Sequence, residues 1–264
     1  MSLSEALLDL QELTRHLRRE CPWDREQTAR TIVPHTVEEA YEVADAALGG
    51  DAEELRGELG DLLFQVYFLA LLLEEKGHGG LEEVARDAHE KLVRRHPHVF
   101  GEAEVSSAGA VRLRWEELKT EQEGREGIFH DVPEALPALL HARKVQRRAA
   151  TVGYDWPDLE GPLAKVREEL DELVAAVSLA GEPSPETEAD AATFDEVGDV
   201  LFTVVNVARK LEVDPELALR ATTRRFTARV ELAAELAAGD GVDWPALDLE
   251  AQDTYYDRAK DTLA

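Results

Sequence analysis

The stretch VEEAYEVADAALGGDAEELRGELGDLLFQV, residues 37–66, predicts two helices that each gather carboxylates on one face. Its acidic pattern is E-E-x-x-E, then a gap, then E-x-x-D. Side chains three or four residues apart stack on the same helix face. Like charges held so close repel, and a bound cation is the simplest reason to place them there. The stretch therefore predicts a multi-metal site on a pair of helices.

The same pattern occurs a second time further along the chain. Glu168 follows Glu38 by 130 positions, and Glu196 follows Glu58 by 138. The difference falls between the two halves of the pattern, where the second copy carries the turn-rich segment GEPSPETEAD (181–190). Duplicated domains usually diverge by such insertions in a connecting loop. The two acidic sets are Glu38, Glu39, Glu42, Glu58 and Asp61 in the first copy, and Glu168, Glu169, Glu172, Glu196 and Asp199 in the second.

Helical periodicity runs through nearly the whole chain, and segments with strand-like alternation are scarce. Ser4 is expected to cap a first helix that ends at CPWD (21–24), and Thr36 with Glu39 forms a capping box for the next. Further helices are expected at 51–76, 81–95, 107–122, 160–180, 188–212, 215–237 and 247–262. The pattern predicts an all-α fold of two tandem helical-bundle domains, at 1–123 and 138–264, joined by a linker at 124–137.

Two aspartates occupy positions where a bare charge is expected to be costly. Asp61 begins a stretch that is apolar on nearly every face, and Asp199 precedes VLFTVVNVA (200–208). Burying an ionised aspartate is strongly unfavourable unless it is paired or binds a metal. Gly60 and Gly198 precede them, although glycine inside a helix costs about 1 kcal/mol relative to alanine. We expect a close neighbour at these glycines: the other motif helix, a partner subunit, or ordinary tight packing.

The types of ligand favour a hard cation. Iron sites in helical bundles use Glu-x-x-His and zinc sites use clustered Cys and His, and the sequence has neither pattern. An all-oxygen set suits Mg²⁺, with Mn²⁺ as the second choice. Because Mg²⁺ held by a few carboxylates completes its shell with water and substrate phosphate, phosphoryl chemistry is the expected reaction class.

Composition excludes several classes of protein. Asp and Glu outnumber Lys and Arg by 56 to 29, which gives a net charge of −27. Binding to duplex nucleic acid needs clustered basic residues, so we do not expect it here. The single cysteine, Cys21, excludes an intrachain disulfide and fits a reducing compartment. The apolar run at 62–73 is too short to span a bilayer, and no signal peptide is recognisable, so a cytoplasmic protein is expected.

Several longer motifs carry a resemblance to a known family. They are CPWDREQT (21–28), EEAYEVADA (38–46), ELGDLLFQV (58–66), KLVRRHPHVF (91–100), RWEELK (114–119) and QRRAATVGYDW (146–156). With the duplicated acidic pattern they cover nearly the whole chain, which resembles the MazG family of nucleoside triphosphate pyrophosphohydrolases in its tandem two-domain form. The resemblance implies all-α domains that pair as a homodimer. It also implies Mg²⁺-dependent hydrolysis of NTPs or dNTPs to the nucleoside monophosphate and pyrophosphate.

The resemblance also assigns roles to the acidic residues. It implies that metal is held by Glu39, Glu42, Glu58 and Asp61 in the first domain, and by Glu169, Glu172, Glu196 and Asp199 in the second. A spare glutamate could take the proton of the attacking water, and Glu38 and Glu168, beside the ligands, are the candidates. Which glutamate does so stays open.

Basic and aromatic residues in each half look like a grip for the nucleotide. A spacing of four places each pair on one helix face, where cations meet phosphates and an aromatic ring stacks on a base. The residues are Lys91, Arg95, Trp115 and Lys119 in the first half, and Arg225, Arg229, Tyr256 and Lys260 in the second. Arginine for lysine and tyrosine for tryptophan in the second half depart from the family pattern. Core packing is the alternative reading of Trp115.

The preferred hypothesis is therefore an NTP pyrophosphohydrolase with a house-cleaning or stress-related role. A protein of another class also fits, a non-catalytic helical regulator that binds metal and nucleotide without turnover. A third possibility is an enzyme with one active and one degenerate domain.

Overall fold

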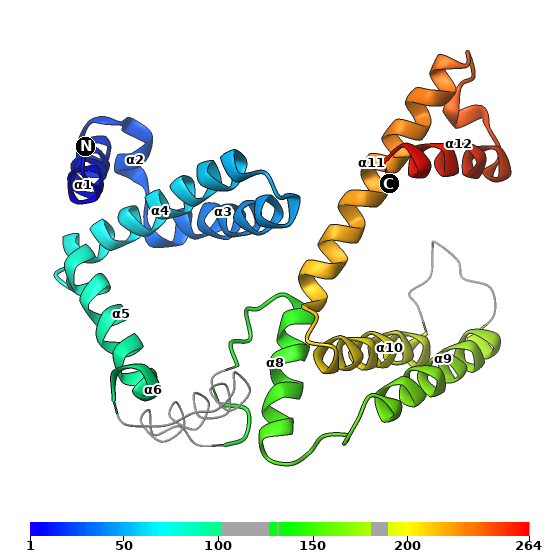
Figure 1. The fold of residues 1–264 in the computed structure, drawn as a ribbon. Helices are drawn as coiled ribbons and strands as arrows, with labels where there is room; N and C mark the ends of the chain where they lie inside the picture. The colour runs from blue at the N-terminus through cyan, green and yellow to red at the C-terminus, as the bar shows by residue number, and fades with distance from the viewer. Residues whose placement is uncertain (102–126, 131, 181–189, 264) are drawn as a thin grey trace. The chain divides into compact units, whose positions relative to one another are not determined.

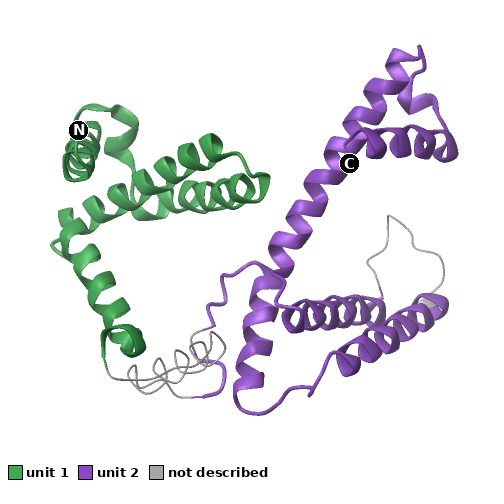
Figure 2. Cartoon of the chain, in the orientation of Figure 1, with its two compact units in different colours: residues 1–124 green, residues 125–264 purple. Residues whose placement is uncertain are grey.

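A computed structural model describes residues 1–101, 127–130, 132–180 and 190–263, and these residues form helices and no strand (Figure 1). The chain divides into two compact units, Met1–Gly124 and Arg125–Ala264 (Figure 2). The predicted all-α class with two helical domains is confirmed. The predicted linker at 124–137 and the domain limits beside it stay a prediction, and the helix expected at 107–122 lies outside the described residues.

The two units are built from helices of similar order. The first contains α1 (Leu3–Glu20), α2 (Pro22–Glu26), α3 (Ala29–Gly49), α4 (Ala52–Glu75), α5 (Leu81–Arg95) and α6 (Pro97–Phe100). The second contains α8 (Ala138–Thr151), α9 (Glu160–Ala180), α10 (Ala191–Lys210), α11 (Pro215–Gly239), the short 3₁₀ helix η1 (Trp244–Ala246) and α12 (Leu249–Thr262). No described helix is long and apolar enough to cross a membrane.

Two helix starts differ from the prediction. Ser2, not Ser4, caps α1, because its hydroxyl accepts the Glu5 N–H while the Glu5 carboxylate accepts the Ser2 N–H at 2.6 Å. The capping box at Thr36 and Glu39 is wrong as well. Helix α3 begins at Ala29 and is capped by Thr28, so that Thr36 lies inside the helix and donates its hydroxyl to the Ile32 carbonyl at 3.4 Å.

The longer α3 has a physical reason in the core. Ile32 lies in the added turns and is 1 % exposed, packed with Phe68 and Leu72 of α4. Burial of a large aliphatic side chain contributes about 1.5–3 kcal/mol. That gain offsets part of the cost of the missing hydrogen bond at Pro34, which lies inside the helix.

Each unit contains a pair of adjacent helices that carries its acidic pattern (Figure 1). In unit 1, α3 ends at Gly50, whose φ of 82° lies in the left-handed region, and Asp51 then caps α4 by accepting the Glu53 N–H at 2.8 Å. In unit 2, α9 and α10 form the corresponding pair, and Asp190 caps α10. The short connection in unit 1 brings the two halves of the acidic pattern onto neighbouring helices.

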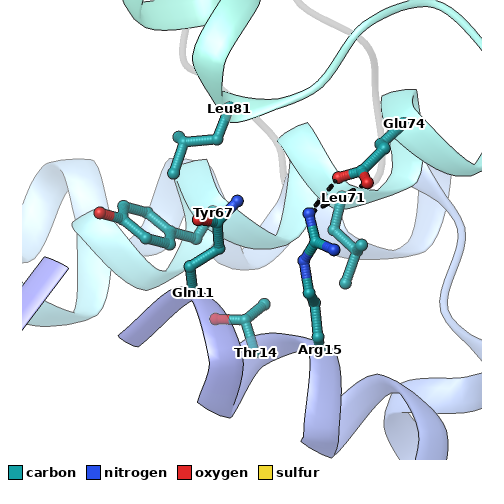
Figure 3. A pocket seen from close by; sticks show the side chains of 7 residues that line it. All are labelled: Gln11, Thr14, Arg15, Tyr67, Leu71, Glu74 and Leu81. Atoms are coloured by element: carbon teal, nitrogen blue, oxygen red, sulfur yellow. Dashed lines mark hydrogen bonds and ion pairs between the residues drawn. The ribbon is translucent and has the colours of Figure 1, made fainter. Parts of the chain in front are cut away.

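Helix α1 is fixed to the C-terminal half of α4. Figure 3 shows a small pocket there, where Arg15 donates to both carboxylate oxygens of Glu74 at 3.0 and 2.8 Å. The pocket is lined by Gln11, Thr14, Arg15, Tyr67, Leu71, Glu74 and Leu81. The lining residue nearest to Asp61 along α4 is Tyr67, six positions further on, which is about 9 Å along a helix axis. No residue of the acidic pattern lines the pocket.

Replacing Arg18 by methionine is expected to lower the free energy of unfolding by about 1.5–3 kcal/mol, as for hydrogen bonds to charged groups. The Arg18 side chain is 17 % exposed and donates twice to the Glu75 carboxylate, both at 2.9 Å, and once to the Gln27 carbonyl at 3.0 Å. Denaturant titration measures the change. The matched control is Arg56→Met, whose exposed ion pair with Glu53 is expected to contribute less than about 1 kcal/mol. Equal effects of the two substitutions would contradict the assignment.

Candidate metal centre

Each helix pair brings three of the predicted carboxylates together. In unit 1, Glu39 of α3 and Glu58 and Asp61 of α4 each offer an oxygen, and these atoms all lie within 4.8 Å of one another. In unit 2, Glu169 of α9 and Glu196 and Asp199 of α10 do the same. We call these groups cluster 1 and cluster 2.

Two further predicted ligands adjoin the clusters. The side chain of Glu42 shares a hydrogen bond with Glu39, and that of Glu172 shares one with Glu169. Each cluster therefore has a fourth carboxyl group beside it, Glu42 at cluster 1 and Glu172 at cluster 2.

Burial within the clusters differs from the prediction. Asp61 and Asp199 were expected to be buried and are exposed, whereas Glu39, Glu58 and Glu196 are half-buried and Glu169 is buried. The apolar residues around both aspartates explain the error, because many of them are themselves exposed in the single chain. Repulsion between close carboxylates, rather than burial of the aspartates, therefore makes the unfavourable contribution to the free energy of folding at these sites.

The glycines beside the aspartates also have open surroundings. A Cβ atom added to Gly60 or Gly198 would meet no described atom within 4 Å outside its own helix turn and chain neighbours. Of the three alternatives, close approach of the other motif helix and tight packing within the same unit are therefore wrong, and a partner subunit stays a prediction.

The charge of the clusters shifts several pKa values upward. The pKa of Glu39 is raised by burial, by its hydrogen bond with Glu42 and by neighbouring negative charge. The pKa of Glu58 is raised by burial and by the charges of Glu42 and Asp61. The pKa of Glu172 is raised by its hydrogen bond with Glu169 and by burial. These shifts therefore combine burial of the carboxyl groups with their closeness to other carboxyl groups.

The donor set fits a hard divalent cation. Every nearby ligand atom is a carboxylate oxygen, and the Glu196 Oε2 atom is buried without a hydrogen-bond partner among the residues that the structure describes. A buried carboxylate oxygen without a partner is costly. A cation between α9 and α10 would supply the missing interaction.

The predicted nucleotide grip does not meet the clusters within a unit. Arg225 and Arg229 lie on α11, and Tyr256 and Lys260 lie on α12, which packs along α11 with Tyr256 and Phe226 ring centroids 6.0 Å apart. In Figure 1 this α11–α12 arm runs away from the α9–α10 pair.

The first-half grip is only partly described. Lys91 and Arg95 lie on α5, which continues away from the α3–α4 pair (Figure 1). Trp115 and Lys119 lie outside the described residues. The described grip residues of each unit therefore lie on other helices than the cluster of that unit.

Comparison with known proteins identifies the family. Residues 27–100, which include cluster 1, match the model of the MazG nucleotide pyrophosphohydrolase domain. The whole chain is similar to the nucleoside triphosphate pyrophosphohydrolase of Escherichia coli K12, with 38 % identity over 263 residues and 98 % of each chain covered. The chain belongs to the MazG family. It is also 39 % identical over 242 residues to the nucleoside triphosphate pyrophosphohydrolase/pyrophosphatase MazG of Thermotoga maritima, covering 91 % of this chain and 89 % of that one.

Lys165, which is not among the predicted site residues, contacts cluster 2. The Lys165 Nζ atom lies 2.7 Å from Glu168 Oε1 and 2.6 Å from Glu169 Oε1. Lys165 lies four residues before Glu169, which is the spacing of an ion pair on a helix, so this contact could have been predicted from the sequence.

The exposed apolar residues near the MazG clusters also repeat. Leu59, Leu63 and Val66 follow one face of α4, and Val197, Leu201 and Val204 follow α10 with the same spacing. Their exposed fractions run from 36 to 50 %. We call these two rows the apolar stripes.

A divalent cation bound at the clusters is expected to stabilise the chain, and this stabilisation is expected to be lost as the pH falls from 8 toward 5. Raised pKa values of Glu39, Glu58 and Glu172 mean that these groups begin to take up protons above their ordinary value of 4.5, and protonated carboxyls do not bind metal. Without metal the sign is opposite: their contribution to stability is present at low pH and lost as the pH rises through the folded pKa values. The measurement is the thermal midpoint with and without metal across this range. An equal metal-induced rise of the thermal midpoint at pH 5 and pH 8 would contradict the prediction. In the Glu39→Gln/Glu172→Gln variant, the metal-induced rise should depend less on pH.

Proposed function

We propose that the protein is a Mg²⁺-dependent pyrophosphohydrolase that cleaves NTPs or dNTPs between the α- and β-phosphates. The products would be the nucleoside monophosphate and pyrophosphate. The observation that carries the proposal is the pair of clusters, each with carboxylate oxygens within 4.8 Å of one another on adjacent helices. The E. coli and T. maritima relatives named as nucleoside triphosphate pyrophosphohydrolases support it.

The clusters would hold the metal through the eight predicted ligands. Bound metal neutralises triphosphate charge and lowers the pKa of an attacking water. The ligands are Glu39, Glu42, Glu58 and Asp61, and Glu169, Glu172, Glu196 and Asp199. Glu38 and Glu168 are candidates to accept the proton of that water, because each is exposed and adjoins a buried or half-buried ligand.

The nucleotide grip would come from a second copy of the chain. Basic and aromatic residues on the α11–α12 arm lie apart from cluster 2 in their own unit, so a homodimer could bring one chain's arm to the partner's cluster. The apolar stripes offer a surface for such a partner, since adjacent exposed apolar residues mark interaction sites. The open surroundings of Gly60 and Gly198 would let the partner's backbone come close.

The experiment is a substrate panel with metal-free protein. Each NTP and dNTP is incubated with and without Mg²⁺, and pyrophosphate, orthophosphate and nucleoside monophosphate are measured separately. Equal amounts of pyrophosphate and monophosphate, only with metal, are expected. Orthophosphate as the product would contradict cleavage at the α–β bond.

The same panel tests the alternative of a non-catalytic regulator. Nucleotide binding in the presence of Mg²⁺, without any product, would support that class instead. A house-cleaning or stress-related role in the cytoplasm is our proposal for the enzyme, and it predicts that some non-standard or damaged nucleotide is hydrolysed faster than the common ones.

A further inference from the structure

The two clusters differ in the residue that stands four positions before their first ligand. In unit 2 this is Lys165, before Glu169, and in unit 1 it is His35, before Glu39. The three ligands of the clusters correspond one to one. This position therefore gives the clearest chemical difference between the two sites.

Lys165 contacts a ligand directly. Its Nζ atom is 2.6 Å from the Glu169 carboxylate, whose side chain is 6 % exposed, and 2.7 Å from that of Glu168. Cluster 2 thus contains a full positive charge from the chain itself.

His35 does not replace that charge. Its Nδ1 atom is 3.7 Å from Glu38 Oε2, and its ring packs edge-on against Trp23 at a centroid distance of 5.8 Å. In the part of unit 1 that the structure describes, no lysine or arginine lies within ion-pair distance of Glu39, Glu58 or Asp61. Within the described part of unit 1, cluster 1 therefore keeps more of its negative charge than cluster 2 does.

We propose that Lys165 weakens divalent-cation binding at cluster 2, so that the two metal sites fill in order, cluster 1 before cluster 2. The ammonium group competes for the Glu169 carboxylate and repels an incoming cation. Even at the dielectric constant of water, a unit charge next to a divalent ion changes affinity by about tenfold. The inference rests on the proposed function only in taking both clusters as metal sites.

The test is Mn²⁺ binding to metal-free full-length protein without nucleotide, followed by calorimetry and by the spin-resonance signal of free Mn²⁺. Asp61→Asn disables cluster 1 and reports on cluster 2, and Asp199→Asn does the reverse. At pH 7.5 we expect the Kd of cluster 2 to be about ten times that of cluster 1.

Exchanging the two residues tests the cause. Lys165→His in the Asp61→Asn background is expected to tighten Mn²⁺ binding about tenfold, and His35→Lys in the Asp199→Asn background to weaken it by a similar factor. Arg167→His is the matched control, because it removes a positive charge from the same helix at an exposed position. It is expected to change the Kd less than about twofold, since solvent screens exposed charges.

Each other outcome overturns the inference in a recognisable way. Equal affinities that Lys165→His does not change would mean that the ammonium group has no influence. Weaker binding in Lys165→His would mean that Lys165 positions Glu169 as a ligand. Mn²⁺ binding at neither cluster would overturn the metal sites themselves, and with them the proposed function. Changed Kd values with unchanged thermal midpoints of the metal-free variants separate the effect from misfolding.

Discussion

Replacing both Asp61 and Asp199 by asparagine is expected to lower pyrophosphate release by about 1,000-fold, the scale of losing a main electrostatic contribution to catalysis. Each substitution removes one charge from a cluster whose oxygens lie within 4.8 Å. Both aspartates are exposed, so the fold should tolerate the change. The assay is initial-rate pyrophosphate release at saturating Mg²⁺ and NTP.

The single substitutions measure how much of the activity each domain contributes. Because both clusters have the same ligand set, each single variant is expected to retain part of the rate. Loss with Asp199→Asn and full activity with Asp61→Asn, or the reverse, would establish one degenerate domain. The matched control for charge is Asp195→Asn, an exposed residue of α10 outside the cluster, which should leave the rate unchanged. Full activity in the double variant would overturn the metal assignment.

Replacing Leu201 by aspartate is expected to convert a homodimer to monomers and to lower the rate more than about 100-fold. Leu201 lies in the apolar stripe of α10 and is 50 % exposed, so a charge there would be buried in the proposed interface without a partner. In a monomer the α11–α12 arm of a second chain would no longer reach cluster 2. Light scattering after size-exclusion chromatography measures the mass, and pyrophosphate release measures the activity.

The control for Leu201→Asp is Leu8→Asp, on the exposed side of α1 and 59 % exposed. It adds the same charge away from the stripes and should keep both the mass and the rate. A dimer that survives Leu201→Asp with full activity would exclude the stripe as the interface.

The sequence predicts the parts of the fold that depend on local signals. The helix at 81–95 is observed as α5, and Asp51 caps α4 where the third helix was expected to begin. The start of α3 was wrong, because two adjacent segments offer capping residues and burial of Ile32 against Phe68 decides between them. Long-range packing of this kind cannot be recognised in a local pattern.

The candidate site shows the same division. The spacing in the sequence was sufficient to predict that Glu39 lies near Asp61, and Glu169 near Asp199, when the helices pair. The burial of the aspartates was misjudged because an apolar stretch does not reveal whether its own chain or a partner covers it. Lys165 was recognisable from its spacing to Glu169, but the acidic pattern consists of carboxylates alone and does not include this cation.

The pairing of neighbouring helices has a consequence for the history of the chain. Asp61 follows Glu39 by only 22 positions and Asp199 follows Glu169 by 30, so each cluster is encoded in one short continuous segment. A single duplication of such a segment copies a whole set of ligands at once, already in register. A site assembled from distant parts of a chain could not be inherited in this way. A helical hairpin can thus be duplicated together with its complete set of metal ligands, while the sequences of the surrounding helices diverge.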